Sequence, residues 1–196
     1  MKSSSGIIVG LFFLGTLSGC ISMTGYVDPQ LKSVSYKDLS TTQKGPELGV
    51  FVEFQRSGQP FTPVTEQARE TVLRVLNKAN VFSSVKRGVF SIKTEARLKV
   101  VINNTRGKTK GSPVATGVTF GAIGTGTIDP YLISAAYEHA DSQPITKEYQ
   151  HAIHSTIGSA SAPEGLKPMT ISDAFDAVVE QVILLLLFDL QQAGKL

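Results

Sequence analysis

Alternating hydrophobic and polar positions mark several short segments of this chain. Strict alternation over four to eight residues is typical of a strand with one face buried. The clearest such runs predict strands at residues 49–54, 97–103, 131–139 and 145–157. The last two are joined by a turn of Asp, Ser, Gln and Pro, so we expect them to form a hairpin with one solvent-facing side. Shorter strands are expected at residues 81–85 and 89–92.

A different spacing begins at Thr62, where apolar residues recur every three or four positions. This spacing predicts an amphipathic helix. Thr62 suits the N-cap and Pro63 the first helical position, while Asn80 suits the C-terminal end.

The second predicted helix follows Thr170, whose spacing to Asp173 resembles a capping box. Residues 182–188 of this helix are apolar on every side. Only eight uncharged residues separate Glu180 from Asp189, too few to span a membrane. We therefore expect the helix to be buried against the sheet, or partly against another subunit.

The order of these elements is strand, helix, several strands, hairpin and helix. Strands that follow one another along the chain tend to pair antiparallel, and the helices flank them. The sequence therefore predicts an α+β fold: a two-layer sandwich with a mostly antiparallel sheet and two helices packed on one face.

The N-terminal segment has the composition of a secretory signal. Lys2 supplies a positive charge, residues 6–17 are uncharged and mostly apolar, and the small residues Ser18 and Gly19 follow. The apolar run is shorter than the roughly 20 residues of a membrane-spanning helix.

Leu17-Ser18-Gly19-Cys20 resembles the lipobox of bacterial lipoproteins. The resemblance implies that signal peptidase II recognises Leu17, Ser18 and Gly19 and cleaves before Cys20. It also implies a diacylglyceryl group on the Cys20 thiol and an acylated amino terminus, with palmitate as an expected acyl group. Cys20 is the only cysteine, so it has no partner for an internal disulfide. Two or more acyl chains would make a stable membrane anchor.

The residue after the lipidated cysteine bears on sorting. In enteric bacteria an Asp at this position usually retains a lipoprotein in the inner membrane, whereas this chain has Ile21 followed by Ser22. By resemblance, we expect attachment to the outer membrane, with the domain facing the periplasm.

Three regions follow from these features: a signal peptide at 1–19, a lipidated Cys with a tether at 20–47, and a single domain at 48–196. The scattered apolar residues of the tether hint that part of it lies on the domain. The formal net charge of the chain is +3, of which Lys2 contributes one. Such a mild bias, without a clustered basic face, does not favour a nucleic-acid partner.

Residues 111–128 carry no charge and are rich in glycine. A glycine-rich loop or irregular strand on the domain is one interpretation. The other is a loop that contacts a membrane or a partner, because uncharged loops are frequent contact sites. Its candidate contact residues are Gly117, Phe120, Gly121, Ile123 and Gly124.

Residues suited to catalysis or to metal binding are sparse. His151 and His154 would point to opposite faces of a strand, and His139 lies near the turn. The sequence therefore predicts no metal site and no cofactor. It contains no G-x-S-x-G elbow, P-loop or H-E-x-x-H motif, so we expect no enzyme activity.

The leading functional hypothesis is a non-catalytic envelope lipoprotein. It would bind a protein, peptidoglycan or lipid partner through the solvent side of the hairpin or through the glycine-rich loop. One alternative is a subunit of an oligomeric secretion or transport assembly. In general plan it would resemble the curli-type secretion lipoproteins, with the uncharged loop entering the membrane. A second alternative is an envelope hydrolase.

Overall fold

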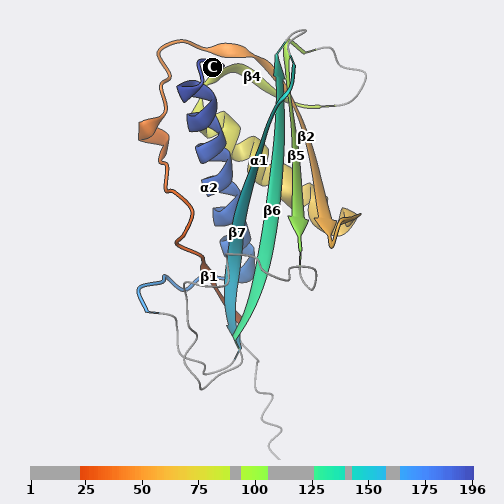
Figure 1. The fold of residues 1–196 in the computed structure, drawn as a ribbon, viewed down its shortest axis with the longest axis vertical. Helices are drawn as coiled ribbons and strands as arrows, with labels where there is room; N and C mark the ends of the chain where they lie inside the picture. The colour runs from red at the N-terminus through yellow and green to blue at the C-terminus, as the bar shows by residue number, and fades with distance from the viewer. Residues whose placement is uncertain (1–22, 89–93, 106–125, 140–142, 158–163) are drawn as a thin grey trace, which may run out of the picture.

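The described strands form one mixed sheet of seven strands. The computed structural model describes residues 23–88, 94–105, 126–139, 143–157 and 164–196 (Figure 1). The strands are β1 (Met23–Val27), β2 (Gly45–Arg56), β3 (Gln59–Pro60), β4 (Phe82–Arg87), β5 (Ala96–Asn104), β6 (Gly126–His139) and β7 (Ile145–Ile157). The helices are α1 (Thr62–Ala79) and α2 (Ile171–Gln192), and a 3-10 turn covers Tyr36–Asp38.

The strands lie in the order β1-β7-β6-β5-β2-β3, and β4 also pairs with β2. Both β4 and β5 run parallel to β2, and the remaining pairs are antiparallel. The parallel pair of β2 and β4 is joined through α1, because parallel neighbours need a crossover connection. The α+β fold with a mostly antiparallel sheet is therefore confirmed.

Both helices pack on the same face of the sheet and close a single core. Phe54 of β2 and Tyr131 of β6 meet Phe175 of α2, with ring centroids 5.8 and 5.9 Å apart respectively. The helix-facing residues of β5 are buried while their neighbours are largely exposed, which is the alternation expected of a half-buried strand. Within the described residues, no helix has the length and apolar character needed to cross a membrane.

The ends of the helices largely agree with the sequence patterns. Asn80 ends α1 in the left-handed conformation (φ 57°), and the Thr170 hydroxyl accepts a hydrogen bond from the Asp173 N–H at 3.0 Å. The N-cap of α1 is Phe61, one residue before the predicted Thr62. The predicted strand at 89–92 lies outside the described residues.

The region predicted as a tether packs on the domain from Met23 onward, as its scattered apolar residues hint. β1 pairs antiparallel with the end of β7, so it is the edge strand of the sheet. Residues 28–44, which we call the N-terminal strap, then run alongside α2 (Figure 1). Their apolar residues Val34 and Leu39 are buried in the core. A free tether would leave these side chains in water, and their burial favours the packed arrangement.

The strap explains the unusual apolar character of α2. Gln191 near the end of α2 donates from Nε2 to the Ser40 carbonyl at 2.7 Å and accepts from the Ser40 N–H at 3.0 Å. The Lys32 ammonium lies 4.2 Å from the centroid of the Phe188 ring. The helix thus contacts both the sheet and the strap, so apolar residues are buried around most of its circumference.

His151 lies in the interface between β7 and α2. Its Nδ1 accepts a hydrogen bond from the Ala152 N–H at 2.9 Å, so the proton of the neutral ring sits on Nε2 and is donated to Gln181 Oε1 at 2.9 Å. Burial is the largest influence on this imidazole and lowers its pKa below the ordinary 6.5. The folded protein therefore holds His151 neutral at pH values where the unfolded chain protonates it.

We expect the free energy of unfolding to decrease as the pH falls below about 6.5, since the unfolded state then binds more protons than the native state. Urea denaturation from about pH 7.5 to about pH 5.0, a range that brackets the ordinary imidazole pKa, measures this slope. His151→Gln should flatten it, whereas Gln150→Ala, at an exposed and non-titrating position of the same strand, should leave it unchanged. Equal slopes in the natural protein and His151→Gln would contradict the assignment.

Candidate functional site on the open face of the sheet

The face of the sheet that points away from α1 and α2 presents side chains from four neighbouring strands. We call it the open face. Strand register assigns to it the following residues: Phe51, Glu53 and Gln55 of β2; Arg97, Lys99, Val101 and Asn103 of β5; Leu132, Ser134, Ala136 and Glu138 of β6; and Thr146, Glu148 and Gln150 of β7. The three β7 residues are exposed, as predicted for the solvent-facing side of the hairpin.

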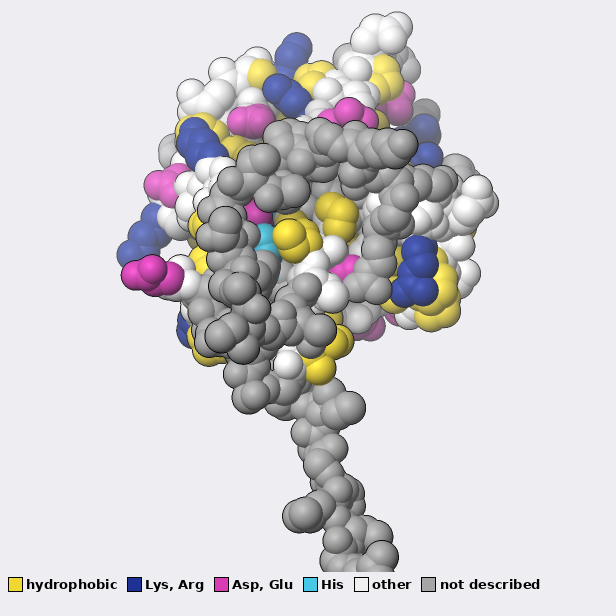
Figure 2. Space-filling view, turned by 60° about the horizontal axis from the view of Figure 1, so that its bottom comes forward, with side chains coloured by type: hydrophobic (Ala, Val, Ile, Leu, Met, Phe, Trp, Pro, Cys, Tyr) yellow, Lys and Arg dark blue, Asp and Glu magenta, His cyan; other side chains and the backbone are white. Residues whose placement is uncertain are grey.

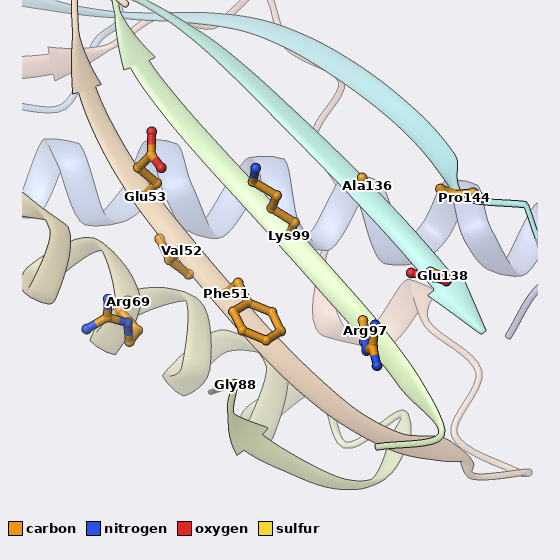
Figure 3. A pocket seen from close by; sticks show the side chains of 10 residues that line it. All are labelled: Phe51, Val52, Glu53, Arg69, Gly88, Arg97, Lys99, Ala136, Glu138 and Pro144. Carbon is orange, nitrogen blue, oxygen red and sulfur yellow. The ribbon is translucent and has the colours of Figure 1, made fainter. Parts of the chain in front are cut away.

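A pocket of about 590 Å³ is hollowed into one end of this face. We call it the open-face pocket. Its lining comes from the open-face strands together with α1 and the residue that follows β4 (Figure 3). The lining residues are Phe51, Val52, Glu53, Arg69, Gly88, Arg97, Lys99, Ala136, Glu138 and Pro144. A volume of this size lies within the range of about 300–1000 Å³ that is usual for small-molecule sites.

The strand register places the charged residues of the pocket side by side. Lys99 of β5 has Phe51 of β2 as its partner on one side and Ala136 of β6 on the other. Two residues before Lys99 on the same face of β5, Arg97 is paired with Glu138 of β6. Lys99 therefore lies between an aromatic ring and a methyl group, and space remains above the small side chain of Ala136.

The cations of the pocket differ in how far they are neutralised. Arg69 of α1 forms an ion pair with Glu66 one turn away. In the described part of the chain, neither Arg97 nor Lys99 forms an ion pair. Two positive groups on the open face thus remain available to a ligand.

The lack of a side chain at Gly88 leaves room for the Phe51 ring. A Cβ atom added at Gly88 would lie 2.7 Å from Cε2 of Phe51, closer than van der Waals contact allows. The Gly88 N–H also donates to the Val50 carbonyl at 2.8 Å, which fixes this backbone beside β2. The absence of a side chain at residue 88 therefore allows the Phe51 ring to lie against the backbone, where it forms an apolar wall of the pocket.

A buried acid–histidine pair lies toward the other end of the same sheet. Nε2 of His154 is 2.8 Å from Oδ2 of Asp28, and the two residues are 1% and 2% exposed. Asp28 Oδ1 accepts from the Gln30 N–H at 2.9 Å, and the Asp28 N–H donates to the Ala152 carbonyl at 3.1 Å. The pair therefore joins the start of the N-terminal strap to β7.

No protein-family model matches this chain, and no curated protein matches it either. Among solved structures, a DUF330 protein from Xanthomonas campestris is 12% identical and has a TM-score of 0.43, with 86% of this chain and 97% of that chain covered. A PelC dodecamer from Paraburkholderia phytofirmans is 14% identical with a TM-score of 0.41, with 82% and 97% covered. At these values neither likeness assigns a family or a function to this chain.

Several residues predicted as sites lie outside the described part of the structure. They are the lipobox residues Leu17, Ser18, Gly19 and Cys20 and the loop residues Gly117, Phe120, Gly121, Ile123 and Gly124.

The two central histidines do point to opposite faces of β7, as strand alternation predicts. His151 contacts Gln181 of α2, and His154 contacts Asp28 on the other face. Within the ranges that the structure describes, no three His, Cys, Asp or Glu side chains come close enough to hold a metal ion.

Proposed function

We propose that this protein is a lipid-anchored lipoprotein of the bacterial envelope with a non-catalytic binding role, and that its open face receives the partner. The observation that carries the binding role is the open-face pocket, with its cations Arg97 and Lys99, on a sheet face that α1 and α2 leave uncovered. The observation that supports the anchor is Leu17-Ser18-Gly19-Cys20 after a charged and then apolar segment.

An acyl group on Cys20 would determine which end of the sheet lies near the membrane. Only Ile21 and Ser22 separate Cys20 from the first residue of β1, Met23. Three residue steps span at most about 11 Å when fully extended. An acylated Cys20 would therefore hold the β1 end of the sheet next to the bilayer.

The same end of the molecule carries apolar surface. Met23 is a large hydrophobic residue that is 50% exposed. Figure 2 looks toward this end and shows hydrophobic side chains near the centre of the view, with charged side chains of both signs toward its edges. The exposed apolar groups suit a surface near lipid, because their burial in the membrane would remove them from water.

The open-face pocket lies at the opposite end of the sheet. Met23 pairs with Ile157, the last residue of β7, whereas Pro144 in the pocket lining precedes the first residue, Ile145. The 13 residues of β7 span roughly 40 Å at about 3.3 Å per residue. The proposed anchor would thus hold the pocket well away from its own membrane. With attachment to the outer membrane, which Ile21 and Ser22 favour, the pocket would face the periplasm.

Chemical crosslinking of the native protein in cells, followed by mass spectrometry, tests the proposed role. A single foreign envelope protein captured in repeated experiments would support an accessory binding role. A ladder of self-crosslinks would instead favour a subunit of an oligomeric secretion or transport assembly. Recovery of the uncrosslinked monomer alone would contradict a stable protein partner.

A further inference from the structure

We infer that the open-face pocket binds a small amphipathic anion, meaning a single negative charge at the end of an apolar chain. A fatty carboxylate and a monoanionic phospholipid share this chemistry. The inference deepens the binding role proposed for the open face and does not depend on the lipid anchor at Cys20.

The apolar part of such a ligand has a defined place. Phe51, Ala136 and Pro144 line the pocket together with the backbone of Gly88 (Figure 3). Because a Cβ at Gly88 would lie 2.7 Å from the Phe51 ring, the ring rests directly against the chain. An alkyl chain that covered this wall would remove apolar surface from water, which is the main source of affinity in sites of this size.

The charged end of the ligand would meet Lys99. Its partners on the neighbouring strands are Phe51 and Ala136, which offer no carboxylate, and no described residue forms an ion pair with Lys99. Arg97 lies two residues away on the same face of β5, and side chains at this spacing point to the same side of a strand. A carboxylate or phosphodiester between them would gain charge-assisted hydrogen bonds.

The acidic residues of the pocket restrict the ligand to one charge. Glu53 and Glu138 stand on either side of Lys99, on β2 and β6. With Arg69 already paired to Glu66, the pocket contains two cations that form no ion pair with a described residue, and these two carboxylates lie beside them without forming an ion pair with either. A ligand with several negative charges would bring some of them toward Glu53 or Glu138, and this repulsion would select against it.

The test uses a fluorescent reporter within the pocket. The chain contains no tryptophan, so Phe51→Trp would provide a single indole signal at the apolar wall. The full-length protein, reconstituted in nanodiscs of phosphatidylcholine, is titrated with octanoate, octanol, acetate and dihexanoyl phosphatidylglycerol, with empty nanodiscs as the blank. Equilibrium dialysis of radiolabelled octanoate against the protein with Phe51 intact gives a second measurement, in case the larger indole disturbs the wall beside Gly88.

We expect octanoate or dihexanoyl phosphatidylglycerol to bind saturably, and at least about tenfold more tightly than octanol or acetate. The tighter of the two anions identifies a fatty acid or a phospholipid as the source. Lys99→Gln should weaken binding of that anion by about tenfold, since it removes one charge-assisted contact. Lys37→Gln removes the same charge from an exposed position on the 3-10 turn and should leave affinity unchanged.

Three results would overturn the inference: no saturable binding of either anion in both measurements, equal affinity for octanol and octanoate, or equal effects of Lys99→Gln and Lys37→Gln. None of these results would affect the crosslinking of a protein partner. The experiments therefore distinguish an error in the proposed ligand from an error in the proposed function.

Discussion

Cys20→Ala is expected to leave residues 1–19 on the chain and to abolish acylation of the protein. The resemblance to a lipobox implies that the lipid is attached to the Cys20 thiol and that cleavage occurs directly before this residue. The chain has no other cysteine that could replace it. The uncleaved apolar segment 6–17 should then hold the variant at the inner membrane. Gel mobility, incorporation of a palmitate analogue and separation of the inner and outer membranes measure the three effects.

Ser33→Ala serves as the matched control, because it changes an exposed residue of similar size in the N-terminal strap and keeps the thiol. It should be cleaved, acylated and sorted like the natural protein. Normal cleavage and outer-membrane location of Cys20→Ala would contradict the proposed anchor.

Asp28→Ala is expected to lower the free energy of unfolding by about 2 kcal/mol, within the range for leaving a buried polar group without its hydrogen-bond partner. The substitution leaves the buried His154 Nε2 without its carboxylate partner at 2.8 Å, and it also removes the acceptor of the Gln30 N–H. Urea denaturation near pH 7 measures the loss. Because Asp28 begins the N-terminal strap, we also expect faster proteolysis within residues 28–44.

Asp38→Ala provides the control, since Asp38 is an exposed carboxylate of the same strap whose bonds go to Ser35. It should lower the free energy of unfolding by less than about 1 kcal/mol. A double variant, Asp28→Ala with His154→Phe, should recover part of the lost stability because no buried imidazole then lacks its partner. Equal losses for Asp28→Ala and Asp38→Ala would show that the buried pair does not fasten the strap.

The sheet and the two helices could be predicted from the sequence, because an element buried on one face has apolar residues at regular spacing. β5 shows this clearly, because its buried apolar residues alternate with the exposed Arg97 and Lys99. β7 alternates only at its start and is buried on both faces from His151 to Thr156. β1 has no such signal, since it is five residues long and is stabilised by pairing with the end of β7, far away in the sequence. The isolated apolar residues of the strap hint that part of it lies on the domain, but no local pattern shows that α2 is the element that buries them.

The open-face pocket could be predicted only in part. The alternation of Arg97 and Lys99 with Leu98 and Val100 shows that both cations share one face of a strand. Nothing local places Gly88 beside Phe51 or Glu138 beside Arg97, because those neighbours depend on strand order and register. The Asp28–His154 pair likewise joins residues 126 positions apart.

Site-specific photocrosslinking in cells tests the central claim, that the open face is the surface that receives a partner. A photoreactive residue is placed at Glu148, which is exposed on the open face, and in a separate variant at Glu70, which is exposed on α1 in the helix layer. The account predicts that the Glu148 probe captures a defined partner and that the Glu70 probe captures little or none. Capture from Glu70 with none from Glu148 would show that the partner binds the helix layer, and it would contradict the assignment of function to the open face.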